Sequence, residues 1–358
     1  MKVAIDAREL EGQRTGVGRY LHEILCAWSG DAAARRHEFV LCSSDAVNTD
    51  AYRGLNLSVQ VASGRGLLWE QLTLPGMLRG LQPDVLLAPG YTAPLSTKVP
   101  TVLVVHDVSF ASHPEWFSWR EGARRRQVTR LAARRAARVV TVSRFSKGEI
   151  EAQLGVPASR ISVIHNGVTA MSGARAQERH DGAVLFVGSI FNRRHVPLLI
   201  DAVALLAGRG LPVSLDIVGD NRTSPPIDLE SHVRLAGVAD RVRVRSWVSD
   251  ADLADCYARA RVFAFLSEYE GFGLTPLEAL AAGVPIVVLD QPVTREIYGG
   301  AATFVSGLDV QSVTEALDRA LFDAGERERV LAAAADVVAS YSWTRSATAL
   351  LALLIEAV

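Results

Sequence analysis

Two glutamates in the second half of the chain, Glu270 and Glu278, have the residue type and the spacing of a ligand-binding loop. Gly271, Phe272 and Gly273 lie between them. Carboxylates accept hydrogen bonds from hydroxyl groups. Glycines let backbone N–H groups approach a phosphate closely, and the positive end of a helix dipole attracts anions. The segment therefore predicts a site for a molecule that carries hydroxyl groups and a phosphate or diphosphate.

A strand–loop–helix–strand unit must position these glutamates. Buried strands are expected at 261–266 and 285–289. Between them, Thr275 is predicted as the helix N-cap, Pro276 as the first helical residue and Glu278 as the third residue after the cap. The helix N-terminus then faces the carboxyl end of a sheet, where open α/β sheets bind ligands.

Part of this pattern has a second interpretation that needs no ligand. Glu278 could close a capping box with Thr275, and Gly283 could do no more than end the helix. Glu270 is not explained in this way, because it precedes the glycines and lies outside the helix. Capping and ligand contact are compatible roles for Glu278, so both interpretations stay open.

Two arginines form a second candidate element of the site. Arg193 and Arg194 follow a predicted strand that leads to Gly188, and they precede a predicted helix. Guanidinium groups suit a diphosphate, and donors already in place stabilise the charge that a departing diphosphate gains. The alternative is a solvated basic turn, which is a common surface feature.

Two weaker patterns follow strands in the first half of the chain. Gly16 and Gly18 form a glycine loop after the first strand, which would let the backbone approach a phosphate. The pattern lacks the third glycine and the acidic residue of a dinucleotide fingerprint, so a flexible surface loop is the alternative. His106 and Asp107 stand at the end of another strand, where the alternative is a purely structural histidine.

A run of arginines in the first half predicts a long basic helix. Its members are Arg120, Arg124, Arg125, Arg126, Arg130, Arg134, Arg135 and Arg138. Such a helix attracts anionic lipid headgroups or a lipid diphosphate, which makes peripheral membrane contact a hypothesis. The alternative is a solvated helix face, because the run has few large apolar residues that would insert into a bilayer.

Composition restricts the class of protein. The 358 residues, 49% of them apolar, suit two domains, and a net charge of −1 gives no general attraction to nucleic acid. Cys26, Cys42 and Cys256 are scattered, so we expect neither a disulfide framework nor a metal site, but a reducing compartment. The N-terminus predicts a strand rather than a signal peptide, and no apolar run reaches the ~20 residues of a membrane span. These features predict a cytoplasmic protein.

Strand and helix patterns alternate along the chain. The predicted strands are 3–6, 39–42, 85–87, 102–105, 139–142, 161–164, 184–187, 214–218, 242–245, 262–265 and 286–288. The predicted helices are 19–28, 71–81, 119–137, 147–154, 196–206, 250–260, 276–282 and 310–321. This alternation predicts parallel sheets that are covered on both faces. The polar segment 169–182 predicts a linker between an N-terminal domain, 1–168, and a C-terminal domain, 183–340.

The segment Glu270-Gly-Phe-Gly-Leu-Thr-Pro-Leu-Glu278-Ala resembles the signature of the retaining GT-B glycosyltransferases of glycosyltransferase family four. Smaller matches, at Trp69-Glu-Gln71 and Pro89–Pro94, are similar to bacterial polysaccharide mannosyl- and rhamnosyltransferases of that family. Residues 142–146 and 163–168 resemble the pattern at the end of the family's N-terminal domain. The resemblance implies an α/β GT-B fold, in which two doubly wound Rossmann-like domains face each other across a cleft. A last helix, within 341–358, is implied to pack back on the N-terminal domain.

The resemblance also implies roles for the candidate residues. The implied catalytic group is Glu270, which contacts the donor sugar, with Arg193, Arg194 and His106. The implied donor-binding group is Gly16, Gly18, Gly188, Gly271, Phe272, Gly273, Leu274, Thr275 and Glu278, in which Glu278 contacts the ribose hydroxyls. Asp107 and Tyr91 are placed on the acceptor side. The family has Lys where this chain has Arg194, which leaves open which arginine faces the leaving group.

We therefore expect a retaining, metal-independent hexosyltransferase without a cofactor. Its expected partners are a nucleotide-sugar donor, with GDP-mannose favoured, and a glycan or lipid-linked acceptor. A UDP- or dTDP-sugar donor is the first alternative. A GT-B sugar-nucleotide epimerase and a silent nucleotide-sugar-binding subunit are the others. The sequence does not predict an oligomeric state.

Overall fold

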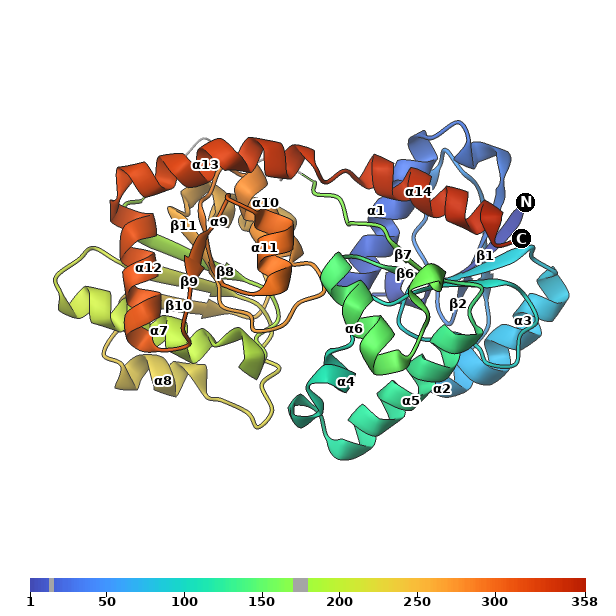
Figure 1. Cartoon of the computed structure of the whole chain (residues 1–358), viewed down its shortest axis with the longest axis horizontal. Helices are drawn as coiled ribbons and strands as arrows, with labels where there is room; N and C mark the ends of the chain where they lie inside the picture. Colours follow the sequence, from blue (N-terminus) through green and yellow to red (C-terminus); the bar gives the residue numbers. More distant parts are fainter. Residues whose placement is uncertain (13–15, 170–179) are drawn as a thin grey trace. The chain divides into compact units, whose positions relative to one another are not determined.

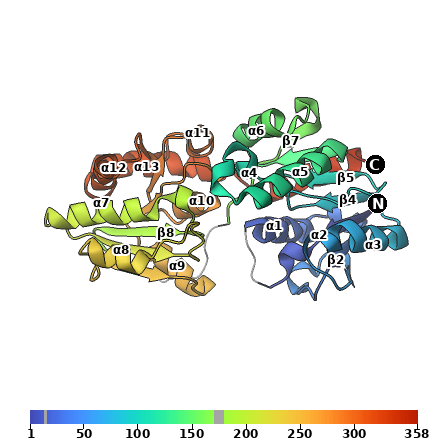
Figure 2. The same ribbon diagram turned by 90° about the horizontal axis from the view of Figure 1, so that it is seen from below.

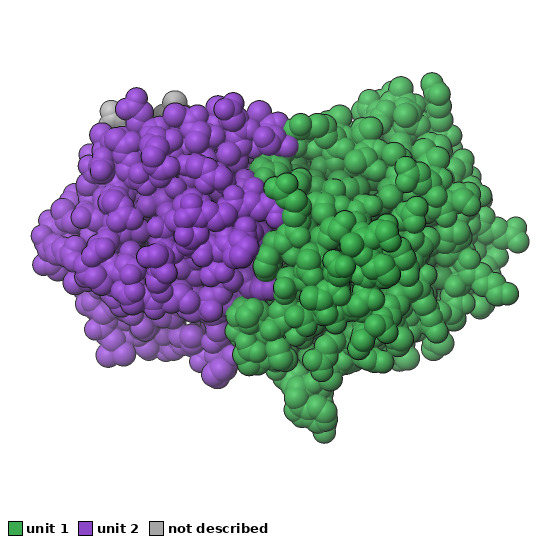
Figure 3. All heavy atoms as spheres, in the orientation of Figure 1, with its two compact units in different colours: residues 1–167, 341–358 green, residues 168–340 purple. Residues whose placement is uncertain are grey.

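The chain forms two compact units, which Figure 3 shows in different colours. The computed structural model describes residues 1–12, 16–169 and 180–358. Unit 1 comprises Met1–Gly167 and Tyr341–Val358, and unit 2 comprises Val168–Ser340. The chain therefore passes from unit 1 into unit 2 and back again. Most of the segment that the sequence predicts as a linker, 170–179, lies outside the described residues.

Unit 1 is built on a seven-stranded parallel sheet. Its strands are β1 (Lys2–Asp6), β2 (Glu38–Ser43), β3 (Asn56–Val61), β4 (Val85–Ala88), β5 (Thr101–Val104), β6 (Arg138–Thr141) and β7 (Ile161–Val163). Their spatial order is β3-β2-β1-β4-β5-β6-β7. The order reverses between β1 and β4, which makes the carboxyl ends of these two strands a topological switch point.

Helices cover both faces of the unit 1 sheet. They are α1 (Gly16–Gly30), α2 (Gly66–Leu68), α3 (Leu74–Leu81), α4 (Ser109–Ser112), α5 (Trp119–Arg135), α6 (Arg144–Leu154) and α14 (Trp343–Glu356). A π-helical turn, Trp69–Thr73, joins α2 to α3. Figures 1 and 2 show α1 and α14 on one side of this sheet and α3 and α5 on the other.

Helix α14 belongs to unit 1 although the chain reaches it only after unit 2. Its backbone accepts a hydrogen bond at Ala347 from the Trp28 indole of α1, over 2.8 Å. The Ser346 hydroxyl donates to the backbone oxygen of His165 over 2.5 Å. The apolar face of α14 is buried against α1, which explains why a helix so rich in leucine is stable at this position.

Unit 2 repeats the same design with a six-stranded parallel sheet. Its strands are β8 (Ala183–Val187), β9 (Ser214–Val218), β10 (Val242–Arg245), β11 (Val262–Phe265), β12 (Ile286–Leu289) and β13 (Thr303–Val305). The spatial order is β10-β9-β8-β11-β12-β13, so the switch point lies between β8 and β11. The central strands β11 and β12 are buried along their whole length, as expected for a sheet that is covered on both faces.

The helices of unit 2 again lie on two sides. They are α7 (Val196–Gly208), α8 (Leu229–Leu235), α9 (Asp250–Arg259), α10 (Leu274–Ala281), α11 (Pro292–Tyr298), α12 (Val310–Phe322) and α13 (Ala324–Ala339). Figure 1 shows α7 and α8 on one side of the sheet and α9 and α10 on the other. The first turn of α10 therefore lies at the carboxyl edge of the sheet, beside the switch point.

The predicted α/β class and the two doubly wound sheets are confirmed, and eleven of the strands match their predicted positions. Sequence reasoning missed β3, β13, α8, α11 and α13, and also the short helices α2 and α4. Strand β3 is an exposed edge strand without a buried apolar run, and β13 has three residues. Both therefore lack the continuous hydrophobic signal by which the other strands were recognised.

Candidate functional site

Helix α10 begins at Leu274, so the predicted N-cap at Thr275 is wrong. The N-cap is Gly273, whose φ of +89° lies in the left-handed region, and no side chain caps the helix. A Cβ at this position would lie 2.0 Å from the Tyr298 hydroxyl oxygen, and this hydroxyl donates to the Gly273 carbonyl over 2.8 Å. Glycine is therefore required here for its backbone angle and for the close approach of Tyr298.

Glu278 lies on the buried face of α10 and does not form a capping box. Its exposed fraction is 2%, and a carboxylate oxygen lies 3.3 Å from the Tyr257 hydroxyl, which donates to it. The structure therefore rejects the interpretation of Glu278 as a helix cap. It confirms the predicted end of the helix, because Gly283 follows α10 with a φ of +70°.

Glu270 and Arg194 form the centre of the site in unit 2. Arg194 donates to the Glu270 Oε1 atom from Nε over 3.0 Å and from Nη2 over 2.8 Å. The Ser267 hydroxyl donates to the same oxygen over 2.8 Å. Within the part of the chain that the structure describes, no donor reaches the second oxygen, Oε2. The carboxylate is therefore fixed in orientation through one oxygen, and the other can accept a hydrogen bond from a ligand.

Arg194 is held in place on three sides. Its Nη1 donates to the Ser189 backbone oxygen over 2.7 Å, and its guanidinium carbon lies 4.8 Å from the centre of the Phe265 ring. A Cβ on Gly188 would lie 2.8 Å from Nη1, so only glycine leaves room for the arginine. Of the five guanidinium N–H groups, three donate to Glu270 and Ser189, which leaves two for a ligand.

Arg193 and its neighbours tie the loop after β8 to the loop after β11. The guanidinium carbon of Arg193 lies 4.4 Å from the centre of the Phe191 ring. Its backbone oxygen accepts a hydrogen bond from the Glu268 N–H over 3.0 Å, and the Glu268 carboxylate lies 2.5 Å from His195 Nε2. The structure therefore distinguishes the two arginines, since Arg194 contacts the candidate acid and Arg193 stacks on an aromatic ring.

The candidate residues of unit 1 gather at the carboxyl ends of β4 and β5. Asp107 accepts a hydrogen bond from the Tyr91 hydroxyl over 2.8 Å and another from the Ser109 N–H over 2.9 Å. The ring of His106 packs at 5.7 Å from that of Tyr91 and edge-on at 4.9 Å from that of Tyr20. Three predicted residues, His106, Asp107 and Tyr91, are therefore brought together.

His106 is half-buried, and burial lowers its pKa in spite of a backbone hydrogen bond to Pro89 and the nearby Asp107 carboxylate. The Nε2 atom lies 2.9 Å from the Pro89 carbonyl oxygen. A carbonyl only accepts, so Nε2 carries the proton of the neutral ring. The bare Nδ1 atom is then the acceptor that His106 can offer to a hydroxyl group.

A buried ion network beside this site was missed by sequence reasoning. Arg8 donates to Asp6 from Nε over 2.9 Å and from Nη2 over 2.6 Å, and to Glu70 over 2.9 Å. Thr92 also donates to Glu70, over 2.7 Å. Burial by itself lowers the pKa of Arg8, but the hydrogen bonds and charges of Asp6 and Glu70 outweigh it and raise the pKa. The polar type of Asp6, at the end of β1, was the signal that could have revealed this network.

Gly16 and Gly18 lie in the first turn of α1 rather than in a loop before it. Residues 13–15, which precede them, lie outside the described residues. Within the described ranges, no group of three or more His, Cys, Asp or Glu residues could hold a metal ion. In the same ranges, no helix combines the length and the apolar character that crossing a bilayer requires.

Two doubly wound domains, each with a polar site at its switch point, define the GT-B class of proteins. Two family models match consecutive parts of the chain. The model described as Glycosyltransferase Family 4 matches residues 14–170, and the model described as Glycosyl transferases group 1 matches residues 181–323. The chain therefore belongs to the GT-B glycosyltransferases, with a family-four domain followed by a group 1 domain.

Curated relatives are similar over part of their length. GDP-mannose:cellobiosyl-diphosphopolyprenol alpha-mannosyltransferase of Komagataeibacter xylinus is 29% identical over 222 residues, which is 61% of this chain and 56% of the relative. O-antigen chain mannosyltransferase B of Escherichia coli is 27% identical over 258 residues, 69% of this chain and 68% of the relative. The matches thus span between about half and two thirds of these relatives.

Solved structures share the fold over the whole chain. HepE of Anabaena in complex with UDP-glucose gives a TM-score of 0.79 at 18% identity and covers 100% of both chains. WaaG, a glycosyltransferase involved in lipopolysaccharide biosynthesis, gives a TM-score of 0.75 at 17% identity, with 99% of both chains covered. At such low identity the likeness establishes the fold alone.

Proposed function

We propose that this protein transfers a hexose from a nucleotide sugar to a glycan or lipid-linked acceptor, with unit 2 as the donor side and unit 1 as the acceptor side. The observation that carries the proposal is the Glu270–Arg194 pair beside the uncapped start of α10. It combines a hydroxyl acceptor, two remaining guanidinium N–H groups and a helix N-terminus, which are the groups that a sugar diphosphate requires.

Mannose from GDP-mannose is the proposed donor group. Two relatives with the word mannosyltransferase in their names support this choice, and one of these names includes GDP-mannose. The structural neighbour HepE binds UDP-glucose, which keeps a uridine donor as the alternative. Glu278 is proposed to contact the ribose, and the backbone around Gly271, Phe272 and Leu274 to approach the diphosphate.

The proposed reaction retains the configuration at the anomeric carbon. The acceptor oxygen attacks from the face that the diphosphate leaves. The bond from the anomeric carbon to the phosphate oxygen breaks, and the acceptor proton passes to the departing diphosphate. Arg194 and Arg193, with the helix dipole of α10, stabilise the charge on the leaving group. These groups supply the positive charge without a metal ion, so we propose a metal-independent reaction.

His106 and Asp107 are proposed to bind the acceptor rather than to act as a catalytic base. Asp107 is ordered by Tyr91, and neutral His106 presents Nδ1. Both groups accept hydrogen bonds, which suits the hydroxyl groups of a sugar. Neither is placed next to a nucleophilic serine or cysteine in an activating arrangement among the described residues.

A ligand panel tests the donor assignment. A ligand that binds only the native state raises the unfolding midpoint, with about 2.7 kcal/mol of stabilisation at 100 times its dissociation constant. We expect GDP and GDP-mannose to raise the midpoint more than UDP, UDP-glucose, UDP-GlcNAc or dTDP-rhamnose. A selective shift with a uridine or thymidine nucleotide would reassign the donor. The absence of any shift would contradict the proposed donor site.

Product analysis tests the reaction itself. With the donor found in the panel, we expect an acceptor glycan to gain the mass of one hexose, with the anomeric configuration of the donor by NMR. The rate should be unchanged in excess EDTA. Inversion would reject the retaining mechanism, and loss of the rate in EDTA would reject metal independence. A changed sugar without a heavier acceptor would indicate an epimerase.

Helix α5 is the proposed contact with a membrane surface. It carries seven arginines and one glutamate in a chain whose net charge is −1, and Trp119 at its start is 77% exposed. Of these arginines, Arg124, Arg126 and Arg130 are exposed and form no ion pair with any described residue. An anionic lipid headgroup layer offers the matching charge.

Vesicle binding tests this contact. Each arginine near an anionic surface contributes about 1 kcal/mol. Replacing Arg124, Arg126 and Arg130 with Gln should therefore weaken binding to phosphatidylglycerol vesicles on the order of a hundredfold. Phosphatidylcholine vesicles should bind neither form. The control carries Arg36→Gln, Arg53→Gln and Arg79→Gln, which remove the same charge elsewhere on unit 1. Equal binding by the two triple variants would reject α5 as the contact.

A further inference from the structure

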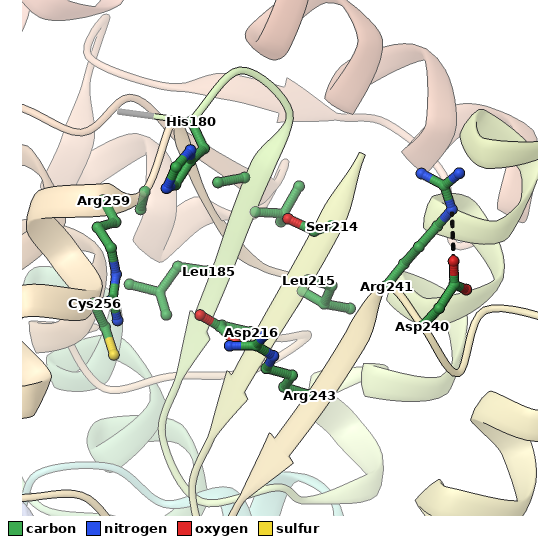
Figure 4. Close-up of a pocket in the computed structure, with 13 residues that line it drawn as sticks. His180, Leu185, Ser214, Leu215, Asp216, Asp240, Arg241, Arg243, Cys256 and Arg259 are labelled. Atoms are coloured by element: carbon green, nitrogen blue, oxygen red, sulfur yellow. Dashed lines mark ion pairs between the residues drawn. The ribbon is translucent and has the colours of Figure 1, made fainter. Parts of the chain in front are cut away.

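A second polar cavity lies in unit 2, away from the site around Glu270. It has a volume of about 270 Å³ and lies on the side of the sheet that α9 covers (Figure 4). Its lining includes Ala183 and Ser214, the first residues of β8 and β9. The cavity is therefore at the amino ends of these strands, whereas Arg194 and Glu270 follow the carboxyl ends of β8 and β11.

Strand alternation explains why this cavity is polar. Side chains along β10 alternate between the two faces of the sheet, so Arg243 and Arg245 share one face while Val242 and Val244 share the other. Asp216 on β9 stands opposite Arg243 in the register. The Asp216 carboxylate, however, forms its ion pair with Arg245, over 3.6 Å.

Arg245 is held through its Nη2 atom by neighbours that belong to the sheet and to α9. Besides Asp216, its Nη2 atom lies 3.2 Å from the Cys256 sulfur of α9. Asp216, one of the two carboxylates that line the cavity, is thereby paired. Arg243, which lines the cavity, is left without the counter-charge that its cross-strand neighbour would otherwise supply.

Two guanidinium groups consequently remain available in the cavity. The side chains of Arg243, on β10, and Arg259, at the end of α9, make no hydrogen bond or ion pair with any residue that the structure describes. At the rim, Arg241 is paired weakly with Asp240, over 3.9 Å. Arg259 by itself could be explained by the negative end of the α9 dipole. Arg243 lies on a strand, so that explanation does not apply to it.

The floor of the cavity is apolar. Val184, Leu185, Leu215 and Ala260 line it and are each buried. Cationic walls above an apolar floor fit a molecule with a compact anionic group and a small organic body. The volume lies below the ~300–1,000 Å³ of sites for drug-sized ligands, which excludes a whole nucleotide sugar.

We propose that this cavity is a second binding site, specific for a small phosphate monoester such as a sugar phosphate. Arg243 and Arg259 bind the phosphate oxygens through their planar N–H groups, and the organic part rests on the apolar floor. The site is independent of glycosyl transfer, since none of its residues belongs to the proposed donor or acceptor sites.

Calorimetric titration with glucose 6-phosphate and with inorganic phosphate tests the site. The titrations use the full chain with Arg194→Ala, which weakens phosphate binding at the proposed donor site. In this background, adding Arg243→Gln and Arg259→Gln should raise the dissociation constant of glucose 6-phosphate at least tenfold. Glucose, which lacks the phosphate, should not bind. Adding Arg209→Gln instead, an exposed arginine at the end of α7, should change nothing.

The outcomes are distinct from those of the transfer assays. No binding of either phosphate probe in the Arg194→Ala background would overturn the proposal, and so would unchanged binding after loss of Arg243 and Arg259. The more conservative Arg243→Lys variant keeps the charge without the planar fork, and we expect an intermediate affinity from it. If a thermal unfolding scan shows that the double variant is unfolded, the Arg243→Lys variant tests the site in its place.

Discussion

The two units place polar residues at the same point of the same sheet topology, but they use their arginines differently. In unit 2, Arg194 donates two hydrogen bonds to one oxygen of Glu270 and keeps two N–H groups for a ligand. In unit 1, Arg8 is enclosed between Asp6 and Glu70. Arg8 is therefore paired with two carboxylates of the protein, whereas Arg194 is paired with one and keeps two N–H groups.

This difference separates the chemistry of the two sites. Among the residues described above, the edge of unit 1 carries the carboxylates of Asp6, Glu70 and Asp107, the guanidinium of Arg8 and the neutral His106. An anion is disfavoured there, and hydroxyl groups are favoured. One fold thus carries a different balance of charge at the sheet edge of each unit, through the placement of one arginine in each.

The largest predicted effect concerns stability. Arg8→Met leaves Asp6 and Glu70 buried without their counter-charge, which should lower the free energy of unfolding by about 3–5 kcal/mol. Urea denaturation measures this change. Arg194→Met should cost less, because it leaves one carboxylate instead of two, and Ser267 still donates to that carboxylate. Equal losses in the two variants would contradict the contrast between a structural and a ligand-facing arginine.

The second prediction concerns turnover. Glu270→Ala should reduce kcat about 10²–10³-fold, the range for loss of one preorganised polar group at a reacting centre. The fold should remain intact by circular dichroism. Glu268→Ala is the matched control, since it removes a neighbouring carboxylate that pairs with His195, and we expect a smaller loss. Turnover by Glu270→Ala at the wild-type rate would refute the assigned role.

A third, smaller effect is expected on the acceptor side. Tyr91→Phe removes the hydroxyl that orders Asp107, a hydrogen bond to a charged group worth about 1.5–3 kcal/mol. The KM for the acceptor should rise about tenfold or more, while the KM for the donor stays the same. A change confined to the donor KM would exchange the roles of the two units.

The smallest effect concerns pH. Because burial lowers the pKa of His106 in the folded state, the unfolded chain takes up this proton first as the pH falls. The stabilising contribution is complete above the ordinary value of 6.5 and is lost as the pH falls from there towards the folded pKa. Wild type should therefore lose more stability than His106→Gln on acidification, by at most about 1.4 kcal/mol per pH unit. Parallel stability curves for both forms would contradict this.

The apolar runs of the sequence predict most strands of the two sheets. Each buried strand of four or more residues can be recognised from its own run of apolar residues. The polar residues that follow β5, β8 and β11 are therefore placed correctly at a sheet edge. The capping pattern at Thr275 failed, because the left-handed Gly273 and the Tyr298 hydroxyl start the helix earlier. Local capping preference was outweighed by a contact from a residue distant in sequence.

Other parts of the site depend on contacts that no local pattern contains. Arg8 meets Glu70 across 62 residues of sequence, and the π-helical turn that presents Glu70 leaves no distinct periodicity. The separate functions of Arg193 and Arg194 could not be predicted either, since the two residues are adjacent and identical in type. The fold distinguishes them, because Arg194 contacts Glu270 and Arg193 lies closer to the Phe191 ring.

The return of the chain to unit 1 has a consequence for biosynthesis. The residues of unit 1 up to Gly167 leave the ribosome first, but helix α14 is made only after all of unit 2. Until then, the surface of α1 around Trp28, whose indole donates to the Ala347 backbone oxygen, stays uncovered. Domains generally fold as they are synthesised, with the N-terminal one first. Here the domain that is begun first is completed last.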